Sequence, residues 1–167
     1  SLEIIEKGSK YCPGGDYRSG SWFSPYPVVS STGRDCWITD VDGNTYLDVN
    51  NNYTSMVLGN SNAAVAAAIK TQVDKGPTIA ASSENAFEWA RLICERIKSI
   101  EQVRFCTSGS EADMHAIRAA RAFTGKDKIL KMEGNYHGSY DPLETSTGWG
   151  KLPWGLPKSV EQDVLVT

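Results

Sequence analysis

The chain has 167 residues, of which 40% are hydrophobic and 22% charged, and this balance is typical of a globular protein with its own core. The net charge of −3, with Lys and Arg scattered along the chain, argues against a nucleic-acid-binding protein. With no signal peptide and no apolar run of about 18 residues, we expect no membrane contact and a cytoplasmic location.

Four cysteines stand at positions 12, 36, 94 and 106, and none forms a C-x-x-C pair. No metal-ligand spacing joins them to His115 or His137, so no metal site is predicted. Cys94 and Cys106 have apolar neighbours and are expected to be buried free thiols, which indicates a reducing compartment.

The first hundred residues contain signals for both strands and helices. Residues 2–10 predict a short helix, and the Gly-, Pro- and aromatic-rich stretch 11–27 predicts an ordered loop. Three short strands are predicted within 28–49, with a hairpin turn at Asp42-Gly43-Asn44. Two helices follow. One is capped by Ser61 or Asn62 and ends at Gly76-Pro77, and the other covers 82–99 with Ser83 as its cap.

The remaining residues alternate between strand and helix patterns. The predicted elements are a strand at 102–107, a helix at 110–123 closed by Gly125, a strand at 128–132, a Gly-rich loop at about 133–158 and a strand at 163–167. This alternation predicts an α/β fold with a parallel sheet and crossover helices. So long a loop is expected to bind something, and the uncovered last strand suggests the front part of a larger fold.

The turn Ser108-Gly109-Ser110 opens the third long helix. A helix N-terminus offers unpaired N–H groups and a partial positive charge, and Gly109 lets a ligand approach the backbone closely. The turn therefore suits a phosphate. Ser108 with Glu111 also fits a capping box, which requires no ligand. Neither a Walker loop nor a G-x-G-x-x-G motif occurs.

The loop EGNYHGSYD, residues 133–141, follows the next strand and presents two ring side chains. Tyr136 and His137 lie between Gly134 and Gly138. An aromatic ring at that place can stack on a flat ligand, or it can fill a local gap in the structure. A phosphate site and a ring platform at neighbouring strand ends together suit a phosphorylated aromatic cofactor.

Three stretches carry a resemblance to a known family: WITDVDGNTYLDV, VRFCTSGSEADMHAIRAARAFTG and KILKMEGNYHGSYD. In order and spacing they resemble the front half of the class III, ω-type aminotransferases, with glutamate-1-semialdehyde aminomutases and β-phenylalanine-type aminotransferases nearest. The resemblance implies an incomplete fold type I enzyme that uses pyridoxal 5′-phosphate (PLP). It also implies an N-terminal segment with short antiparallel strands over 1–55 and the front part of the large PLP-binding domain over 56–167.

The same resemblance implies roles for individual residues. Ser108, Gly109 and Ser110 would bind the PLP phosphate, and Glu111 would lie near the edge of the cofactor ring. Tyr136 would stack on the pyridine ring with His137 beside it. Two further residues would contact the substrate, Arg18 through its carboxylate and Tyr53 as an aromatic of the pocket. An exposed structural role for Arg18 remains an alternative.

The sequence departs from the family pattern in several places. The family usually has Gly-His where Gly59-Asn60 stands, Pro at Ala63 and an apolar residue at Asn85. The Schiff-base lysine and the acid at the pyridine nitrogen lie, in the family, beyond Thr167. None of the lysines at 126, 128 and 131 is expected to replace that lysine, so the catalytic residue is unknown and this chain alone is expected to be inactive.

The resemblance implies transfer of an amino group between an amino acid, β-amino acids included, and a keto acid or aldehyde. The alternatives are an aminomutase acting on glutamate-1-semialdehyde and a non-catalytic segment that binds a phosphate ligand. The implied partners are a small amino donor, a carbonyl acceptor and a second copy of the protein in a homodimer.

Overall fold

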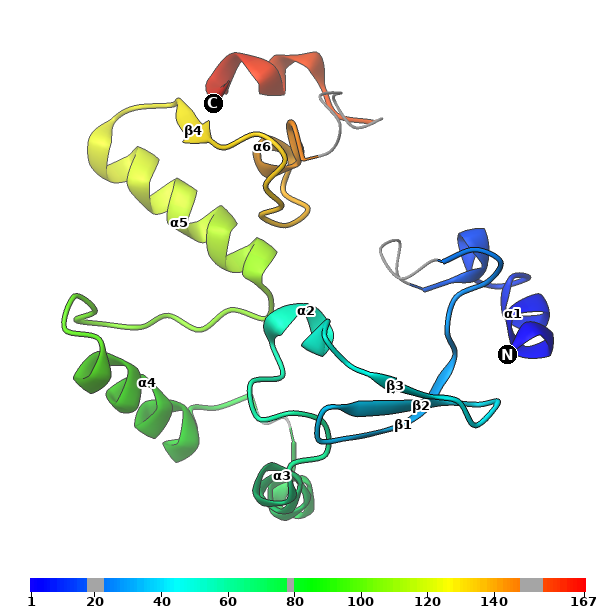
Figure 1. Cartoon of the computed structure of the whole chain (residues 1–167). Coiled ribbons are helices and arrows are strands. Elements are labelled where there is room, and N and C mark those ends of the chain that lie inside the picture. Colours follow the sequence, from blue (N-terminus) through cyan, green and yellow to red (C-terminus); the bar gives the residue numbers. More distant parts are fainter. Residues whose placement is uncertain (18–22, 78–79, 148–154) are drawn as a thin grey trace. The chain divides into compact units, whose positions relative to one another are not determined.

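The computed structural model describes residues 1–17, 23–77, 80–147 and 155–167 (Figure 1). The chain divides into two compact units, Ser1–Ala81 and Ser82–Thr167, and each is described by itself. The domain boundary expected between residues 55 and 56 concerns a longer protein, and it stays a prediction.

A three-stranded antiparallel sheet forms the middle of the first unit. Its elements follow the order α1 (Leu2–Gly8), η1 (Pro13–Gly15), β1 (Ser30–Arg34), β2 (Trp37–Asp40), β3 (Thr45–Leu47), α2 (Asn51–Thr54) and α3 (Ala63–Lys75). The short first helix, the three strands and the hairpin turn are confirmed. Asn62 caps α3, because its side chain accepts bonds from the N–H groups of Ala64 and Val65.

The β2–β3 hairpin is organised around the buried carboxylate of Asp40. That carboxylate accepts hydrogen bonds from the N–H groups of Asp42 and Asn44, at 2.9 and 2.8 Å. It also accepts from the side-chain amide of Asn44 and from the hydroxyl of Tyr46, both at 2.9 Å. Gly43 takes a φ of 87° in the turn, where a side chain would be strained. One side chain therefore accepts four hydrogen bonds from donors of this hairpin.

Helix α2 is a left-handed turn. Its four residues, Asn51 to Thr54, have φ between 50° and 67°, and none of them is glycine. Left-handed backbone costs roughly 1–2 kcal/mol for an ordinary residue. The side chain of Asn50 accepts a bond of 2.7 Å from the N–H of Tyr53, which helps to hold the turn.

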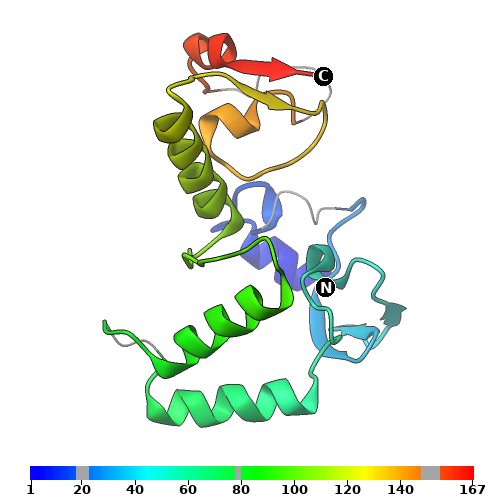
Figure 2. The same cartoon turned by 90° about the vertical axis from the view of Figure 1, so that its left-hand side faces the viewer.

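The second unit is an α/β arrangement around a parallel strand pair. Its elements are α4 (Glu84–Arg96), α5 (Gly109–Thr124), β4 (Ile129–Lys131), α6 (Asp141–Glu144), η2 (Lys158–Asp163) and β5 (Val164–Val166). Figure 2 shows β4 and β5 side by side. The predicted caps are confirmed. Ser83 accepts from the N–H of Ala86, and Gly125 ends α5 in the left-handed conformation.

Three predictions for this unit are wrong. Residues 102–107 form no strand, because no other described segment pairs with their N–H and C=O groups. The expected loop at 133–158 contains α6, and η2 begins at its last residue. Cys94 and Cys106 are half-buried rather than buried, since the helix and segment that carry them have little packed over them.

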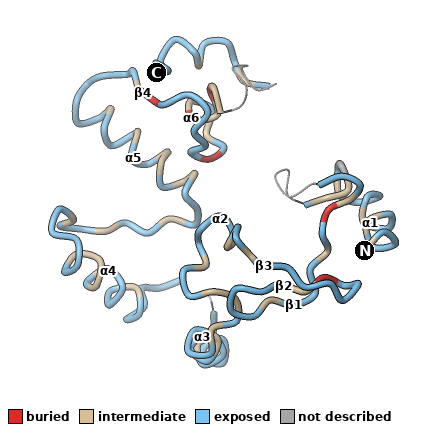
Figure 3. Tube along the Cα trace, viewed as in Figure 1, coloured by how far each residue is buried: buried red, intermediate tan, exposed pale blue. Residues whose placement is uncertain are grey.

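Burial is sparse throughout the described residues (Figure 3). The buried apolar residues there are Leu143 and Val164 of the second unit and Pro27 of the first. The described parts of α3, α4 and α5 contain no buried residue. The apolar stripes of these helices therefore lie open to solvent.

Candidate functional site

The first turn of α5 is closed by a variant of the predicted capping box. The hydroxyl of Ser108 accepts a bond of 3.2 Å from the N–H of Glu111. In return, the Glu111 carboxylate accepts a bond of 2.7 Å from the N–H of Thr107, one residue earlier than in the usual box. The structural interpretation of Ser108 and Glu111 is thus confirmed.

The capping box leaves two donors of the helix unused. Within the described residues, the N–H groups of Gly109 and Ser110 have no hydrogen-bond partner. A Cβ at Gly109 would meet no atom within 4 Å, so a ligand can approach this part of the backbone. The free amides and the positive end of the helix dipole both favour an anion at this position.

The loop that carries Tyr136 and His137 is attached to this same turn. The N–H of Ser139 donates a bond of 3.1 Å to the hydroxyl of Ser110. Gly138, with φ of 93°, lies against Ser110 so closely that a Cβ there would come within 2.7 Å of the Ser110 Cα. Only glycine fits this approach, and the predicted phosphate turn and ring loop are therefore brought together.

Glu111 places negative charge beside the unused donors. The bond from the Thr107 N–H holds the pKa of Glu111 below its ordinary value. His115 lies one helical turn further on, with its Nε2 3.7 Å from the Glu111 carboxylate, and its positive form also favours the ionised acid. The lowered pKa keeps Glu111 ionised, so an anion at Gly109 would be held by the free amides against the charge of this carboxylate.

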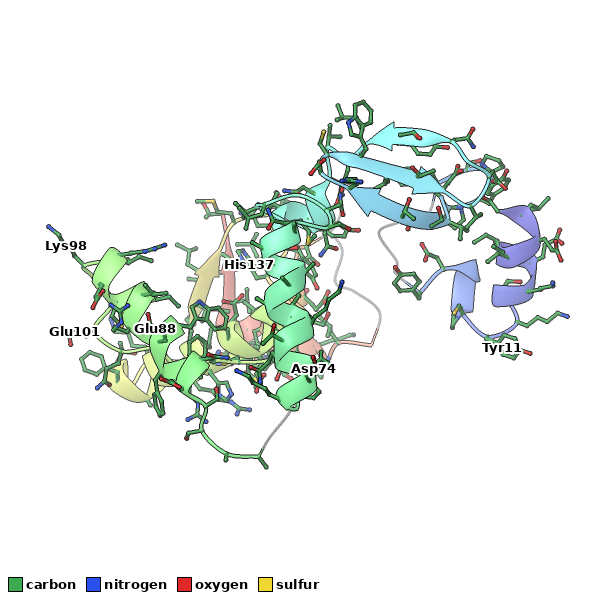
Figure 4. The ribbon with its side chains drawn as sticks, turned by 90° about the horizontal axis from the view of Figure 1, so that it is seen from below. Tyr11, Asp74, Glu88, Lys98, Glu101 and His137 are labelled. Carbon is green, nitrogen blue, oxygen red and sulfur yellow. The ribbon has the colours of Figure 1, made fainter. Side chains whose placement is uncertain are left out.

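A cavity of about 550 Å³ lies between α5 and β4. Its walls are largely apolar, and they are formed by Asp113, Ala116 and Ile117 of α5, residues 129–132, Asn135, His137 and Leu143. The side chain of His137, labelled in Figure 4, is the one predicted site residue that lines it. Tyr136 is 70% exposed and lies outside this wall. The cavity therefore adjoins the ring loop, and neither Gly109 nor Ser110 lines it.

Comparison with known proteins settles the family. The family model for class III aminotransferases matches residues 19–148, which is most of the chain. The chain belongs to the class III aminotransferase family.

Class III relatives of known name resemble the chain over nearly its whole length. The glutamate-1-semialdehyde 2,1-aminomutase of Methanocaldococcus jannaschii is 41% identical over 159 residues, which are 95% of this chain and 37% of that protein. The enzyme of the same name from Thermoplasma volcanium is 42% identical, over 95% of this chain and 38% of its own. The chain thus spans less than two fifths of the relatives it matches.

Solved class III structures confirm the fold. An ω-transaminase from Sphaerobacter thermophilus matches 99% of this chain and 40% of its own, with a TM-score of 0.93 and 37% identity. A β-phenylalanine aminotransferase from Variovorax paradoxus matches 100% of this chain and 37% of its own, with a TM-score of 0.86 and 34% identity. The prediction of an incomplete fold type I, α/β architecture is confirmed.

The two residues expected to contact a substrate, Arg18 and Tyr53, belong to the first unit of the chain. Tyr53 lies in the left-handed turn α2 of the first unit and is 56% exposed. Arg18 lies outside the described residues. Their contact with a substrate stays a prediction.

Sequence reasoning missed Lys131, which is 6% exposed. In the sequence it is one of three lysines, at 126, 128 and 131, in or near a predicted strand. Its place in the apolar run KILKM, with alternate residues facing opposite sides, is the signal that could have indicated a buried ammonium group. The bond between Ser139 and Ser110 has no such local signal.

No helix in the described part of the chain is long and apolar enough to cross a membrane. The same residues contain no group of three or more His, Cys, Asp or Glu side chains arranged to hold a metal ion.

Proposed function

We propose that this chain forms part of a PLP-dependent enzyme that moves an amino group between an amino acid and a keto acid or aldehyde. The observation that carries the proposal is the pair of unused amides at Gly109 and Ser110, with the Tyr136–His137 loop fastened to Ser110. The family match supports the choice of cofactor, because class III aminotransferases are PLP enzymes.

In this proposal, each part of the site has its own task. The amides of Gly109 and Ser110 and the hydroxyls of Ser108 and Ser110 hold the phosphate, which favours charge-assisted bonds at a helix N-terminus. The hydroxyl of Ser110 already accepts a bond from Ser139, so its proton is free to be donated.

In the same proposal, the loop that carries Tyr136 and His137 contacts the aromatic ring of the cofactor. Tyr136 would stack on the pyridine ring with His137 beside it, and Glu111 would lie near the ring edge. When bound, PLP supplies an electron sink for the carbon that bears the amino group.

Two reactions fit the relatives. Similarity to the ω-transaminase and to the β-phenylalanine aminotransferase favours transfer between two molecules, with β-amino acids among the donors and Arg18 as a carboxylate partner. The 41% identity to an aminomutase favours isomerisation of glutamate-1-semialdehyde. A protein that contains this chain and a Schiff-base lysine distinguishes the two. An aminomutase turns over glutamate-1-semialdehyde alone, whereas a transaminase requires an added amino donor and carbonyl acceptor.

A third hypothesis is a non-catalytic segment that binds a phosphate ligand, and it predicts binding without turnover in that same longer protein.

A homodimer and a cytoplasmic location belong to the proposal as well. Sedimentation of the longer protein tests the dimer, since a monomer at micromolar concentration would contradict it.

The phosphate site is tested by replacing Gly109 with proline and with alanine. Proline is well tolerated at the first position of a helix and lacks the N–H, and Ser108, with φ −148° and ψ 163°, already has the extended backbone that precedes proline. Both variants carry a Cβ, so their difference isolates one amide. We expect Gly109→Pro to bind PLP at least about tenfold more weakly than Gly109→Ala, because a hydrogen bond to a charged group contributes roughly 1.5–3 kcal/mol.

Binding of PLP, inorganic phosphate and pyridoxal, which has no phosphate, is measured by isothermal titration calorimetry of the chain. Circular dichroism checks that α5 is intact in both variants. Equal affinity of the two variants for PLP, or tighter binding of pyridoxal than of PLP, would show that these amides do not hold the phosphate.

A further inference from the structure

Lys131 is a buried ammonium group on β4. Its side chain is 6% exposed, and its Nζ donates to the main-chain carbonyls of Leu143 at 2.8 Å and Thr145 at 2.6 Å. Both acceptors lie at the C-terminal end of α6 and just beyond it, where helix carbonyls lack partners within the helix. A positive charge is favourable there, so Lys131 fastens the end of α6 to the strand.

The segment between Lys131 and Leu143 is the loop that carries Tyr136 and His137. The loop leaves β4 directly after Lys131 and returns at α6, so the bonds from Nζ close its base. A second bond at the base runs from the N–H of Gly134 to the carbonyl of Ser146, at 2.8 Å. The far side of the loop is attached to α5 through Ser139 and Ser110. The loop is thus held at two places, and Lys131 holds one of them.

The environment of Lys131 argues against a reactive amine. Burial lowers the pKa of its amine, and the nearby Glu144 carboxylate acts in the opposite direction. Its Nζ donates two hydrogen bonds to carbonyl oxygens, and both bonds would have to break before the amine could act as a nucleophile. Burying an ammonium group is costly unless it is well bonded, so a role in holding the loop accounts for its position.

We propose that Lys131 is a positioning residue that keeps the Tyr136–His137 loop seated on the first turn of α5. Its effect on a ligand rests on the proposed PLP site, where the loop supplies the contacts to the ring. Lys131 touches neither the ring nor the phosphate in this proposal.

Three variants of the chain test the role. Lys131→Met keeps the length of the side chain and removes the donor, while Lys131→Arg keeps a positive donor. Lys128→Met removes an exposed lysine three residues earlier and serves as the matched control. Hydrogen exchange is followed at the N–H groups of Gly134 and Ser139, with the amides of α4 as an internal reference for the stability of the whole unit.

We expect Lys131→Met to speed exchange at Gly134 and Ser139 about tenfold, with α4 unchanged, and Lys131→Arg to restore part of the protection. Unchanged exchange at both amides would overturn the proposal. An equal rise in the loop and in α4 would also overturn it, because that result means only a loss of overall stability.

Ligand titrations separate this proposal from the proposed function. Lys131→Met should lose about tenfold more affinity for PLP than for inorganic phosphate, since the displaced loop bears the ring contacts. If the unaltered chain binds neither ligand, the phosphate site proposed at Gly109 and Ser110 fails for this chain, while faster exchange in the loop still supports the positioning role. If Lys131→Met loses the same factor in affinity for PLP and for inorganic phosphate, the proposal that Lys131 supports the contacts to the ring is overturned.

Discussion

Gly138 is the residue at which one added methyl group has the largest expected effect on the site. Alanine there would combine a φ of 93° with a Cβ only 2.7 Å from the Cα of Ser110. Gly134, in the same loop, also has a positive φ of 74°, but a Cβ there would meet no atom within 4 Å. Comparing alanine at these two positions therefore separates the cost of backbone strain from the cost of steric contact.

We expect Gly134→Ala to lower the free energy of unfolding by about 1–2 kcal/mol, the cost of left-handed backbone. Gly138→Ala should lose roughly 1–3 kcal/mol more, because the loop must move away from α5. Native-state hydrogen exchange at the N–H of Ser139 in the loop measures the difference as a free energy of local unfolding. Equal losses would mean that the loop does not rest on Ser110 in solution.

Some residues of the site could be read from the sequence, and others could not. Ser108, Ser83 and Gly125 were predictable because a cap acts on backbone groups three or four residues away. The bond between Ser139 and Ser110 joins residues 29 positions apart. Spacing along the chain carries no information on such a pair, so its role became visible only in the folded loop.

Among the elements, the β2–β3 hairpin has the clearest dependence on pH. The side-chain amide of Asn44 and other donors hold the pKa of Asp40 below its ordinary 3.8. The bond to Asp40 raises the pKa of Tyr46 above its ordinary 10.0. The contribution of Asp40 to stability is therefore present above pH 3.8 and is lost as the pH falls through its lower folded value. The contribution of Tyr46 is present below pH 10.0 and is lost as the pH rises through its higher folded value.

We expect Asp40→Asn to move the titration of Tyr46 back toward its ordinary pKa, because the carboxylate that binds its hydroxyl is gone. Ultraviolet absorbance follows tyrosine ionisation, and Tyr46→Phe identifies the signal among the seven tyrosines. Asp42→Asn serves as the comparison and should shift the Tyr46 pKa less, since Asp42 raises it through charge alone and not through a hydrogen bond. A Tyr46 pKa that is the same in Asp40→Asn and in the unaltered chain would contradict the bond.

The elements that were predicted correctly depend on local signals. Helices α3, α4 and α5 have caps and apolar periodicity within their own residues, and the hairpin has its Asp-Gly-Asn turn. The strand predicted at 102–107 failed because a strand also requires a neighbour, which its own sequence cannot supply. The left-handed turn α2 was missed because nothing in Asn-Asn-Tyr-Thr forces four consecutive positive φ values.

At the scale of the molecule, the chain exposes far more surface than a compact protein of its mass. Its accessible surface is 13,445 Å². Two separate compact domains of about 9 kDa each would together expose about 9,800 Å². Much of the excess is apolar, because side chains such as Phe87, Trp89 and Ile69 are more than half exposed.

We expect the isolated chain to bind a hydrophobic dye such as ANS and to unfold with little cooperativity. Its urea m-value should fall at or below the low end of the usual range of roughly 1–3 kcal/mol/M, because unfolding exposes little new surface. A compact monomer of similar mass serves as the control. A steep single transition without dye binding would show that these apolar faces are covered in solution.

The family could be predicted from the sequence because its signature lies in three continuous stretches, all within the part that the chain contains. The reaction could not, since the relatives that resemble these residues include both aminomutases and transaminases. The side chains expected to decide between the two reactions, Arg18 and Tyr53, belong to the first unit, whereas the phosphate turn belongs to the second.

The pairing of β4 with β5 has a consequence for the order of assembly. Ile129 pairs with Val164, so the ring loop lies inside the connection between two parallel strands. During synthesis, β4 leaves the ribosome more than thirty residues before its partner, so the strand pair and the bond from the N–H of Glu133 to the carbonyl of Thr167 cannot form until β5 has emerged. The cofactor pocket is therefore expected to mature in two steps, because the contact of the loop with Ser110 can form before β5 exists, whereas the strand that leads into the loop gains its partner last.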